Sequence, residues 1–489
     1  MNFNGKIADT LAAAGHDVVV YQPVINGQIR ETGSSHKDIR YYFKERNESI
    51  YFDFEEKQSI VWEQKGITDF GRFIEELYDV KRIFCEDTMR DDEILWKLRN
   101  EKFDLGITEI FNSCGFAVFH AIGLKKFIAT NQIGFSFTYS GLLGIPMAPS
   151  FQASAFSELP SKMTFFQRVQ NLVFSFIEDY AVNKMYINSV HDSVIQKYPD
   201  FNIKKKIKEA AFMFVNTDEI VDEAVPITSK LIHIGGLGKS ESKPLDQKYQ
   251  EIFNSSKKGV IYFSLGSVVH SSSMPESYKR AFLEAFAEFP EINFIWKYER
   301  ESDNIAKDLK NVFTFDWLPQ NDILEHGKLL AFISHAGTNS MIEGASKGVP
   351  TICVPVFIDQ LHNAKILEEK GIAVIVNKHD ISKKTIMAAI RRILENPGFK
   401  EKAKIVSKMI QAKPMTPEER VVKYAEFAAQ FGDTDVFQSK GRHLNIIQLY
   451  SIDVIFFLVF VIVAIGYGIF RLVKEILHVP SKFSHLKEE

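Results

Sequence analysis

Residues 317–376 read WLPQNDILEHGKLLAFISHAGTNSMIEGASKGVPTICVPVFIDQLHNAKILEEKGIAVIV, and this stretch decides the fold. Within it, Leu330–Ser334 and Thr351–Val356 are short apolar runs of the kind that form buried strands. Between them, HAGTNSMIEGASKG is a small-residue turn that leads into a helical pattern. Short buried strands that alternate with helices predict a parallel sheet covered on both faces, and therefore an α/β domain.

The alternation of helix and short strand continues on both sides of this stretch. A chain of 489 residues is too long for one ordinary core, so two domains of roughly 200 residues each are expected. Further strands are predicted at Val18–Tyr21, Phe103–Ile110, Phe127–Thr130, Val260–Phe263, Phe294–Tyr298, Val312–Phe315 and Ala373–Val376. Helices are predicted at Lys6–Ala14, Asp91–Asn100, Thr416–Gln430 and across the Phe- and Met-rich residues 151–189, which we expect to cover an apolar cavity.

Composition shifts along the chain divide it into segments. The polar run KSESKPLDQKYQ has the character of an interdomain linker, and Thr416, Pro417 and Glu419 have the spacing of a capped helix start. We expect a Rossmann-like domain at 1–235, a linker at 236–250, a second Rossmann-like domain at 251–415, a helix that crosses back with a juxtamembrane segment at 416–448, a transmembrane helix at 449–471 and a cytoplasmic tail at 472–489.

Charge and cysteine content exclude some classes of protein. The formal net charge is -3, which does not suggest a nucleic-acid partner. The three cysteines, Cys85, Cys114 and Cys353, form no CxxC pair, so a structural zinc site is not expected. Cys114 and Cys353 lie in apolar runs, and both are predicted to be buried thiols.

One segment has the composition of a membrane span. Val454–Phe470 contains no charged residue, and with its apolar flanks it reaches the length that crosses a bilayer. A buried core helix is the alternative, but no later domain exists to cover this one. Basic residues after the span orient the tail toward the cytoplasm, namely Arg471, Lys474, Lys482 and Lys487.

Two loops in the second half have the composition of anion sites. FSLGS at 263–267 and ISHAGTNS at 333–340 each follow a predicted strand, where ligands bind in such sheets. The second loop opens a helix, whose free N–H groups and dipole favour an anion. A small-residue turn is an equally good interpretation of either loop alone, but two in one domain favour a diphosphate.

Other side chains in this half suit a nucleotide-sugar. Trp317 can stack on a base, and Gln320 can bond the edge of that base. Glu343 can hold the ribose hydroxyls, while Asp359 and Gln360 can hold those of a sugar. Each residue alone is more often an ordinary core or surface residue, but this order and spacing make that interpretation improbable. A dehydrogenase is a distant alternative because no strand-linked GxGxxG exists.

The stretch from Trp317 resembles the donor-binding signature of the UDP-glycosyltransferases, in particular the animal UDP-glucuronosyltransferases. FDLGITEIF, HIGGLG, FSLGS and YSIDVI resemble the same family in order. The resemblance implies a GT-B fold, in which two Rossmann-like domains face each other across a cleft, one for a small lipophilic acceptor and one for the UDP-sugar. By motif, Trp317 and Gln320 would face uracil, Glu343 the ribose, Asp359 and Gln360 the sugar, and the diphosphate would be faced by Ser267, His335, Gly337, Thr338, Asn339 and Ser340.

The family resemblance also implies a mechanism. A histidine takes the proton of the acceptor hydroxyl as that oxygen displaces UDP with inversion, and a carboxylate orients the histidine. No metal or cofactor is required, since the UDP-sugar is a substrate. The family carboxylate is usually Asp, whereas this chain has Glu109 at the matching position; a surface acid at a strand end is the alternative for Glu109. Glucuronic acid is the expected sugar, with glucose left open.

The matching position for the histidine falls just before Met1. His16 is no substitute, because it lies at the far end of the same predicted helix, about 20 Å away. We expect the natural product to be longer, with a secretory signal, an apolar strand and a histidine next to residue 1. Without that strand, the strand that would lie beside it in the first sheet should have no pairing partner on that side. The chain as printed is expected to bind UDP without transfer, so a silent UDP-sugar-binding or hetero-oligomerising chain is the alternative function.

The cellular setting follows from the same features. We expect a single-pass protein of the endoplasmic reticulum, with lumenal catalytic domains and a short cytoplasmic tail, provided that the natural product carries a signal peptide. The expected partners are the UDP-sugar, the acceptor, the membrane and further copies of this or a related chain.

Overall fold

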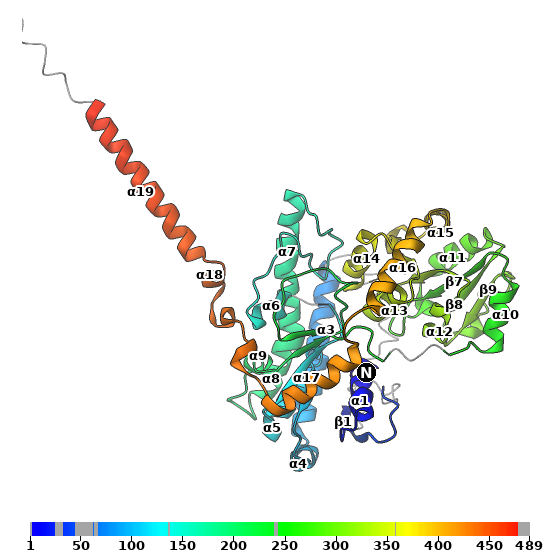
Figure 1. Ribbon diagram of the computed structural model, residues 1–489, viewed down its shortest axis with the longest axis horizontal. Coiled ribbons are helices and arrows are strands. Elements are labelled where there is room, and N and C mark those ends of the chain that lie inside the picture. Colours follow the sequence, from blue (N-terminus) through cyan, green and yellow to red (C-terminus); the bar gives the residue numbers. More distant parts are fainter. Residues whose placement is uncertain are drawn as a thin grey trace, which may run out of the picture.

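The computed structural model describes residues 2–24, 33–44, 62, 67–134, 137–238, 243–356 and 358–477. Two lobes of helices around parallel sheets lie side by side, and a long C-terminal helix projects away from both (Figure 1). Residues 239–242 of the predicted linker and 478–489 of the predicted tail lie outside the described residues.

The first lobe contains a four-stranded parallel sheet in the order β3-β4-β5-β6 and a separate parallel pair, β1-β2. Its strands are β1 (Val19–Pro23), β2 (Arg40–Lys44), β3 (Gly106–Glu109), β4 (Phe127–Asn131), β5 (Met213–Val215) and β6 (Leu231–His233). Its helices are α1 (Asn2–Ala13), α3 (Ile67–Arg90), α4 (Asp92–Asn100), α5 (Cys114–Ile122), α6 (Phe137–Leu143), α7 (Phe165–Val182), the π-helix η2 (Asn183–Asn188), α8 (Ser189–Val194) and α9 (Ile203–Lys208).

Among the described residues, β1 pairs only with β2 and β3 only with β4. The two sheets of the first lobe are therefore not joined by a ladder, and β3 is an edge strand.

The second lobe contains a six-stranded parallel sheet in the order β12-β11-β10-β7-β8-β9. Its strands are β7 (Gly259–Ser264), β8 (Ile292–Lys297), β9 (Val312–Phe315), β10 (Leu329–Ser334), β11 (Thr351–Cys353) and β12 (Ala373–Ile375). Its helices are α10 (Gln247–Ser255), α11 (Glu276–Ala287), α12 (Gln320–Glu325), α13 (Thr338–Ser346), α14 (Gln360–Glu369), α15 (Lys383–Glu395) and α16 (Gly398–Gln411), with short 3-10 turns η3 (Ser271–Ser273), η4 (Glu301–Asp303) and η5 (Lys378–Asp380).

Helix α17 (Pro417–Phe431) returns from the second lobe to the first, where it lies beside α1 (Figure 1). It starts with the predicted capping box, in which the Thr416 side chain accepts from the Glu419 N–H. Its buried Val421 and Ala425 pack in one apolar cluster with Phe3 of α1. The predicted helix and its capped start are confirmed.

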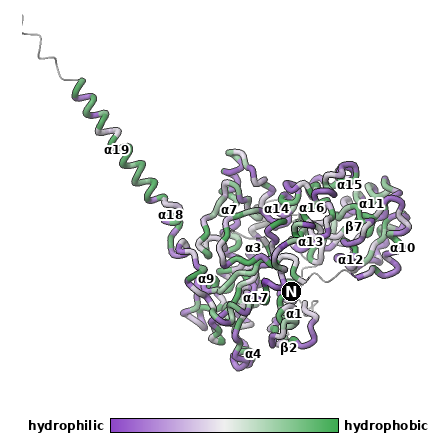
Figure 2. The backbone as a smooth tube through the Cα atoms, viewed as in Figure 1, coloured by the Kyte–Doolittle hydropathy of each residue, from purple (hydrophilic) through white to green (hydrophobic). Residues whose placement is uncertain are grey.

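The C-terminal segment contains η6 (Asp435–Phe437), η7 (Lys440–His443), α18 (Ile446–Leu449) and α19 (Ile452–Leu477). Ser451, with φ of 53°, separates α18 from α19. Among the described residues, α19 is the one helix long and apolar enough to cross a membrane, and none of its most apolar window is buried. Its surface is almost continuously hydrophobic (Figure 2).

Cys114 was expected to be a thiol, and that prediction is wrong. Cys85 near the end of α3 and Cys114 at the start of α5 form a disulfide, with their Cα atoms 5.4 Å apart. The two residues are 29 positions apart, so their proximity depends on how α3 packs on α5. Cys353 is a buried free cysteine, as predicted.

Two further boundaries differ from the expectation. Residues 151–164 are not helical, and α7 starts only after the Thr164 capping box, because Pro160 interrupts the run and Thr164 favours a helix start. At the other boundary, the final four residues of the predicted linker form the first turn of α10. Tyr249 is buried there in the core of the second lobe, which a free linker would not allow.

Candidate functional site

The two predicted anion loops meet at the carboxyl edge of the second sheet. Ser264 ends β7 and pairs directly with Ser334, which ends β10. The loops that follow these residues therefore leave the sheet side by side. Ser267 lies exposed on the first of them, one residue beyond Gly266.

The His335 ring lies between the glycines of these two loops. A Cβ atom on Gly266 would come within 2.7 Å of the ring carbon Cε1, and one on Gly337 within 2.4 Å of Nε2. Gly266 also has φ of +88°, which disfavours other residues. Burial, with Lys297 nearby, lowers the pKa of His335 to about 4, so the imidazole is neutral at pH 7 and can donate one N–H.

The start of α13 holds the next group of predicted residues. Gly337 is the N-cap, and Thr338 donates from Oγ1 to Oδ2 of Asp359 at 3.0 Å. Asn363 donates to the same oxygen at 2.8 Å, while burial raises the pKa of Asp359. Gln360 is 5% exposed and its Oε1 accepts from the Val356 N–H, so this side chain fixes the preceding loop.

The predicted base and ribose residues are also in contact. Gln320 donates from Nε2 to Oε2 of Glu343 at 2.6 Å, and Ser340 lies 3.5 Å from the same nitrogen. Trp317 is 66% exposed, which leaves its ring face available for a base. Lys297 Nζ lies 5.7 Å from the centre of that ring. The tertiary structure thus brings together residues that are twenty or more positions apart.

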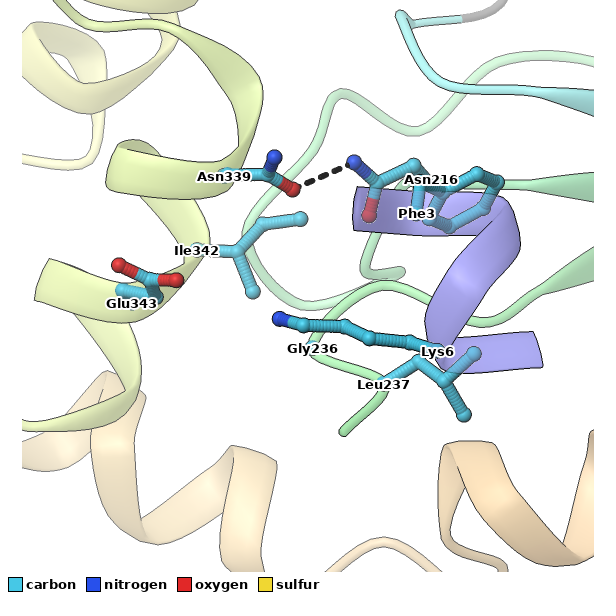
Figure 3. Close-up of a pocket in the computed structure, with 8 residues that line it drawn as sticks. All are labelled: Phe3, Lys6, Asn216, Gly236, Leu237, Asn339, Ile342 and Glu343. Carbon is cyan, nitrogen blue, oxygen red and sulfur yellow. Dashed lines mark hydrogen bonds between the residues drawn. The ribbon is translucent and has the colours of Figure 1, made fainter. Parts of the chain in front are cut away.

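The first lobe contributes side chains to a pocket opposite this edge (Figure 3). Asn216, just after β5, donates to Oδ1 of Asn339 at 2.8 Å and so bridges the lobes. Lys6 extends from α1 along Gly238, and its ammonium points toward the side of the pocket that carries Glu343 (Figure 3). The pocket is lined by Phe3, Lys6, Asn216, Gly236, Leu237, Asn339, Ile342 and Glu343.

Glu109 ends β3 in the first lobe and is largely enclosed. Burial raises the pKa of its carboxyl, and a hydrogen bond from Gln132 and the charge of Lys81 oppose that shift. Its Oε1 atom is buried without a hydrogen-bond partner among the described residues. Burial lowers the pKa of Lys81 to about 7, and its ammonium lies 4.3 Å from the ring centre of Tyr186.

Tyr186 connects the two carboxylates electrostatically. Burial raises the pKa of its hydroxyl well above the usual value, and the charges of Glu109 and Asp359 add to that rise. One carboxylate of each lobe, the predicted catalytic Glu109 and the predicted sugar-binding Asp359, therefore influences the same buried hydroxyl.

Sequence reasoning missed the first-lobe residues of this site. Lys6, Lys81, Tyr186 and Asn216 lie on different elements, and their neighbours in the chain carry no motif. The position of Glu109 at a strand end was the one local signal in this lobe.

Comparisons with known proteins agree with this geometry. Residues 1–487 match the family model for "UDP-glucoronosyl and UDP-glucosyl transferase". The chain belongs to this family. It is 32% identical over 469 residues to the putative UDP-glucuronosyltransferase ugt-48 of Caenorhabditis elegans, covering 92% of this chain and 88% of the relative. It is 30% identical over 433 residues to UDP-glucosyltransferase 2 of Dactylopius coccus, covering 87% and 81%.

A comparison with solved structures, together with the family, gives the fold and the enzyme class. A solved UDP-glucose:anthocyanidin 3-O-glucosyltransferase, in complex with UDP, superposes with a TM-score of 0.54 at 15% identity, covering 88% of this chain and 95% of that one. The protein has the GT-B fold, and it is a UDP-glycosyltransferase that takes its sugar from a UDP-sugar donor. The fold class and the family expected from the sequence are confirmed.

Proposed function

We propose that this family member transfers glucuronic acid from its UDP conjugate to a hydroxyl of a small lipophilic acceptor, with inversion. The observation that carries the proposal is the hydrogen-bonded set at the carboxyl edge of the second sheet. There, Gln320 bonds Glu343 and Thr338 bonds Asp359. Such pre-oriented groups bind a nucleotide-sugar with little ordering cost.

The donor half of the proposal assigns a role to each residue. Trp317 stacks on uracil, Gln320 bonds its edge and Glu343 holds the ribose. Asp359 and Gln360 serve the sugar; Gln360 does so through the loop that it fixes. The diphosphate is bound by the loop hydroxyls and the α13 N-terminus, through Ser267, His335, Gly337, Thr338, Asn339 and Ser340. As UDP leaves, these donors meet the charge that develops on its phosphate.

For the acceptor site, the proposal assigns Glu109 a position next to the hydroxyl group that reacts. Its unpartnered oxygen is suited to accept the N–H of a base and hold that base in the orientation that removes the proton. The aromatic rings of Phe111 and Tyr186, tilted against each other with centroids 4.5 Å apart, belong to the same lobe, and they favour an apolar acceptor.

A second candidate is a chain that binds UDP-sugar without turnover. It is favoured by one observation: none of the described histidines is hydrogen-bonded to Glu109. The donor residues serve both candidates equally, so the two differ only in whether sugar is transferred.

The test uses the full chain in phospholipid nanodiscs. UDP release is measured with UDP-glucuronic acid or UDP-glucose and a simple phenol as acceptor. Release with UDP-glucuronic acid, reduced by about 10²–10⁴ in Glu109→Gln while the Kd for UDP stays the same, supports the proposal. Preference for UDP-glucose refutes the assigned sugar. Tight UDP binding with no release from either donor establishes the silent chain instead.

We further propose that α19 anchors the protein in the endoplasmic reticulum membrane with both lobes in the lumen. Its apolar residues Val454–Phe470 and the basic residues that follow this run, Arg471 and Lys474, support this. Protease added to sealed microsomes should then remove only the tail beyond Arg471. Digestion of both lobes from the cytoplasmic side would refute the orientation.

A further inference from the structure

Over most of its length, helix α7 buries polar side chains and exposes apolar ones. Asn171, Ser175 and Glu178 are each no more than 1% exposed, although they are polar. The exposed apolar side chains are Phe165, Phe166, Val169, Leu172, Val173, Phe176 and Tyr180. A helix on the surface of a soluble domain shows the opposite distribution.

The buried polar face fixes the helix in this orientation. Asn171 accepts from the Ser154 N–H at 2.9 Å and donates to two carbonyls of the preceding loop at 2.8 Å. Glu178 accepts from the Ser154 hydroxyl at 2.7 Å and from the Ala155 N–H at 2.9 Å. Turning the apolar face inward would break all five bonds and take their partners away from polar groups of the loop at 149–155, which is unfavourable where those groups are buried.

The exposed apolar residues recur at steps of three and four, so they form one stripe along the helix. Phe166 at 81% and Phe165 at 64% exposure stand out at its start. Arg168 and Gln170, both exposed, flank the stripe. A continuous apolar stripe with a polar border marks a surface that is covered in the working protein.

The position of α19, the proposed membrane anchor, indicates what covers the apolar stripe of α7. Ser439 donates to the Gly144 carbonyl at 2.9 Å, and Tyr450 donates to the Met147 carbonyl at 2.8 Å. Tyr450 is two residues before the start of α19, so Met147 lies at the base of the helix that we proposed above to cross the bilayer, and the inference rests on that proposal. Residues 144–147 continue directly into the loop that α7 holds, and α7 stands on the side of its lobe nearest α18 and α19 (Figure 1).

We propose that the exposed apolar stripe of α7 lies in the surface layer of the same bilayer that α19 crosses. The phenylalanine and valine side chains enter the boundary between headgroups and acyl chains, and Arg168 extends to the phosphates. The protein therefore contacts the membrane at two places, which fixes the orientation of the first lobe. A second copy of the chain could also cover the stripe. The bilayer is favoured because α19, once it crosses the membrane, places the bilayer next to this surface.

The test places one nitroxide label at a time on the full chain in phosphatidylcholine vesicles. The labelling site is Val173→Cys, because Cys353 is buried and the other two cysteines are paired. Ile405→Cys on α16 is the matched control, since Ile405 is 57% exposed and Val173 is 55% exposed. Phe176→Cys is a second site on the stripe. Relaxation of each label by oxygen, which concentrates in lipid, is compared with relaxation by a water-soluble nickel chelate.

We expect the ratio of oxygen to nickel relaxation to be several-fold higher at Val173 and Phe176 than at Ile405. Equal ratios at all three sites would show that the stripe faces water and would overturn the proposal. Protection from both reagents, with dipolar broadening between labels, would show that a second copy covers the stripe and would also overturn it.

Discussion

Asn216 in the first lobe donates from Nδ2 to Oδ1 of Asn339 in the second lobe, at 2.8 Å. This bond fixes the orientation of the Asn339 amide, so that its oxygen faces Asn216 and its NH₂ group faces away from Asn216 (Figure 3). Asn339 is one of the residues proposed to bind the diphosphate, and an amide NH₂ is the donor that a phosphate oxygen needs. The first lobe therefore orients a side chain of the second lobe that we propose binds the donor.

Removing this orienting bond should weaken UDP binding. Asn216→Ala is expected to cost about 0.5–1.5 kcal/mol, or roughly a 2- to 10-fold rise in Kd by calorimetry. Asn339→Ala should cost at least as much, and adding Asn216→Ala to it should change the Kd little further. Fully additive losses in the double variant would show that Asn216 acts independently of Asn339.

Loss of the exposed indole at the uracil position should also weaken UDP binding. Trp317→Ala is expected to remove stacking worth about 1–3 kcal/mol, measured by calorimetry with UDP on the full chain. Trp96→Ala is the matched control, because Trp96 is 63% exposed on α4 of the other lobe. Equal affinities of the two variants would remove Trp317 from the donor site.

A buried acid makes stability depend on pH. Burial raises the pKa of Asp222 to about 7; the nearby Asp218 and Asp359 carboxylates add to the shift, and the Asp218 N–H and Lys370 oppose it. In an unfolded chain the aspartate pKa is about 3.9. The folded state thus holds an extra proton between these values, so the free energy of unfolding falls as pH rises from about 4 to about 7.

Asp222→Asn should remove the part of the fall in the free energy of unfolding that Asp222 causes as pH rises. The variant keeps an oxygen for the Asp218 N–H but carries no charge, so its melting temperature should fall less between about pH 5 and about pH 8 than that of the unaltered chain. Some fall should remain, because burial also raises the pKa of Glu223 to about 7. Asp200→Asn, at a carboxyl that is 80% exposed, is the control. An unchanged pH profile in Asp222→Asn would contradict the assignment.

The Cys85–Cys114 disulfide should stabilise the first lobe. It closes a loop between positions 29 residues apart, for which chain entropy gives about 3–4 kcal/mol. Cys85→Ser is therefore expected to lower the melting temperature, and a reducing agent should do the same to the unaltered chain. If reduction changes neither the melting temperature nor the number of free thiols, the pair is not bonded.

Several features followed from the sequence because they depend on neighbouring residues. The capping box of α17 uses Thr416 and Glu419, three positions apart. The small residues around His335 open a helix directly after a strand, which is a local pattern of apolar run, turn and helical period. Glu109 was identified through the resemblance of FDLGITE to a family motif, which is likewise a run of neighbouring residues, and it ends β3.

Tertiary structure decided what depends on residues far apart in the chain. Cys85 and Cys114 meet because α3 packs near α5, and Asn216 reaches Asn339 only because the lobes face each other. Helix α7 has the period of an ordinary amphipathic helix, and that period is the same whichever face is buried. The buried bonds of Asn171 and Glu178 select the polar face. Spacing along a chain defines a helix and its two faces, whereas the groups that reach those faces are set by long-range packing, which no local pattern encodes.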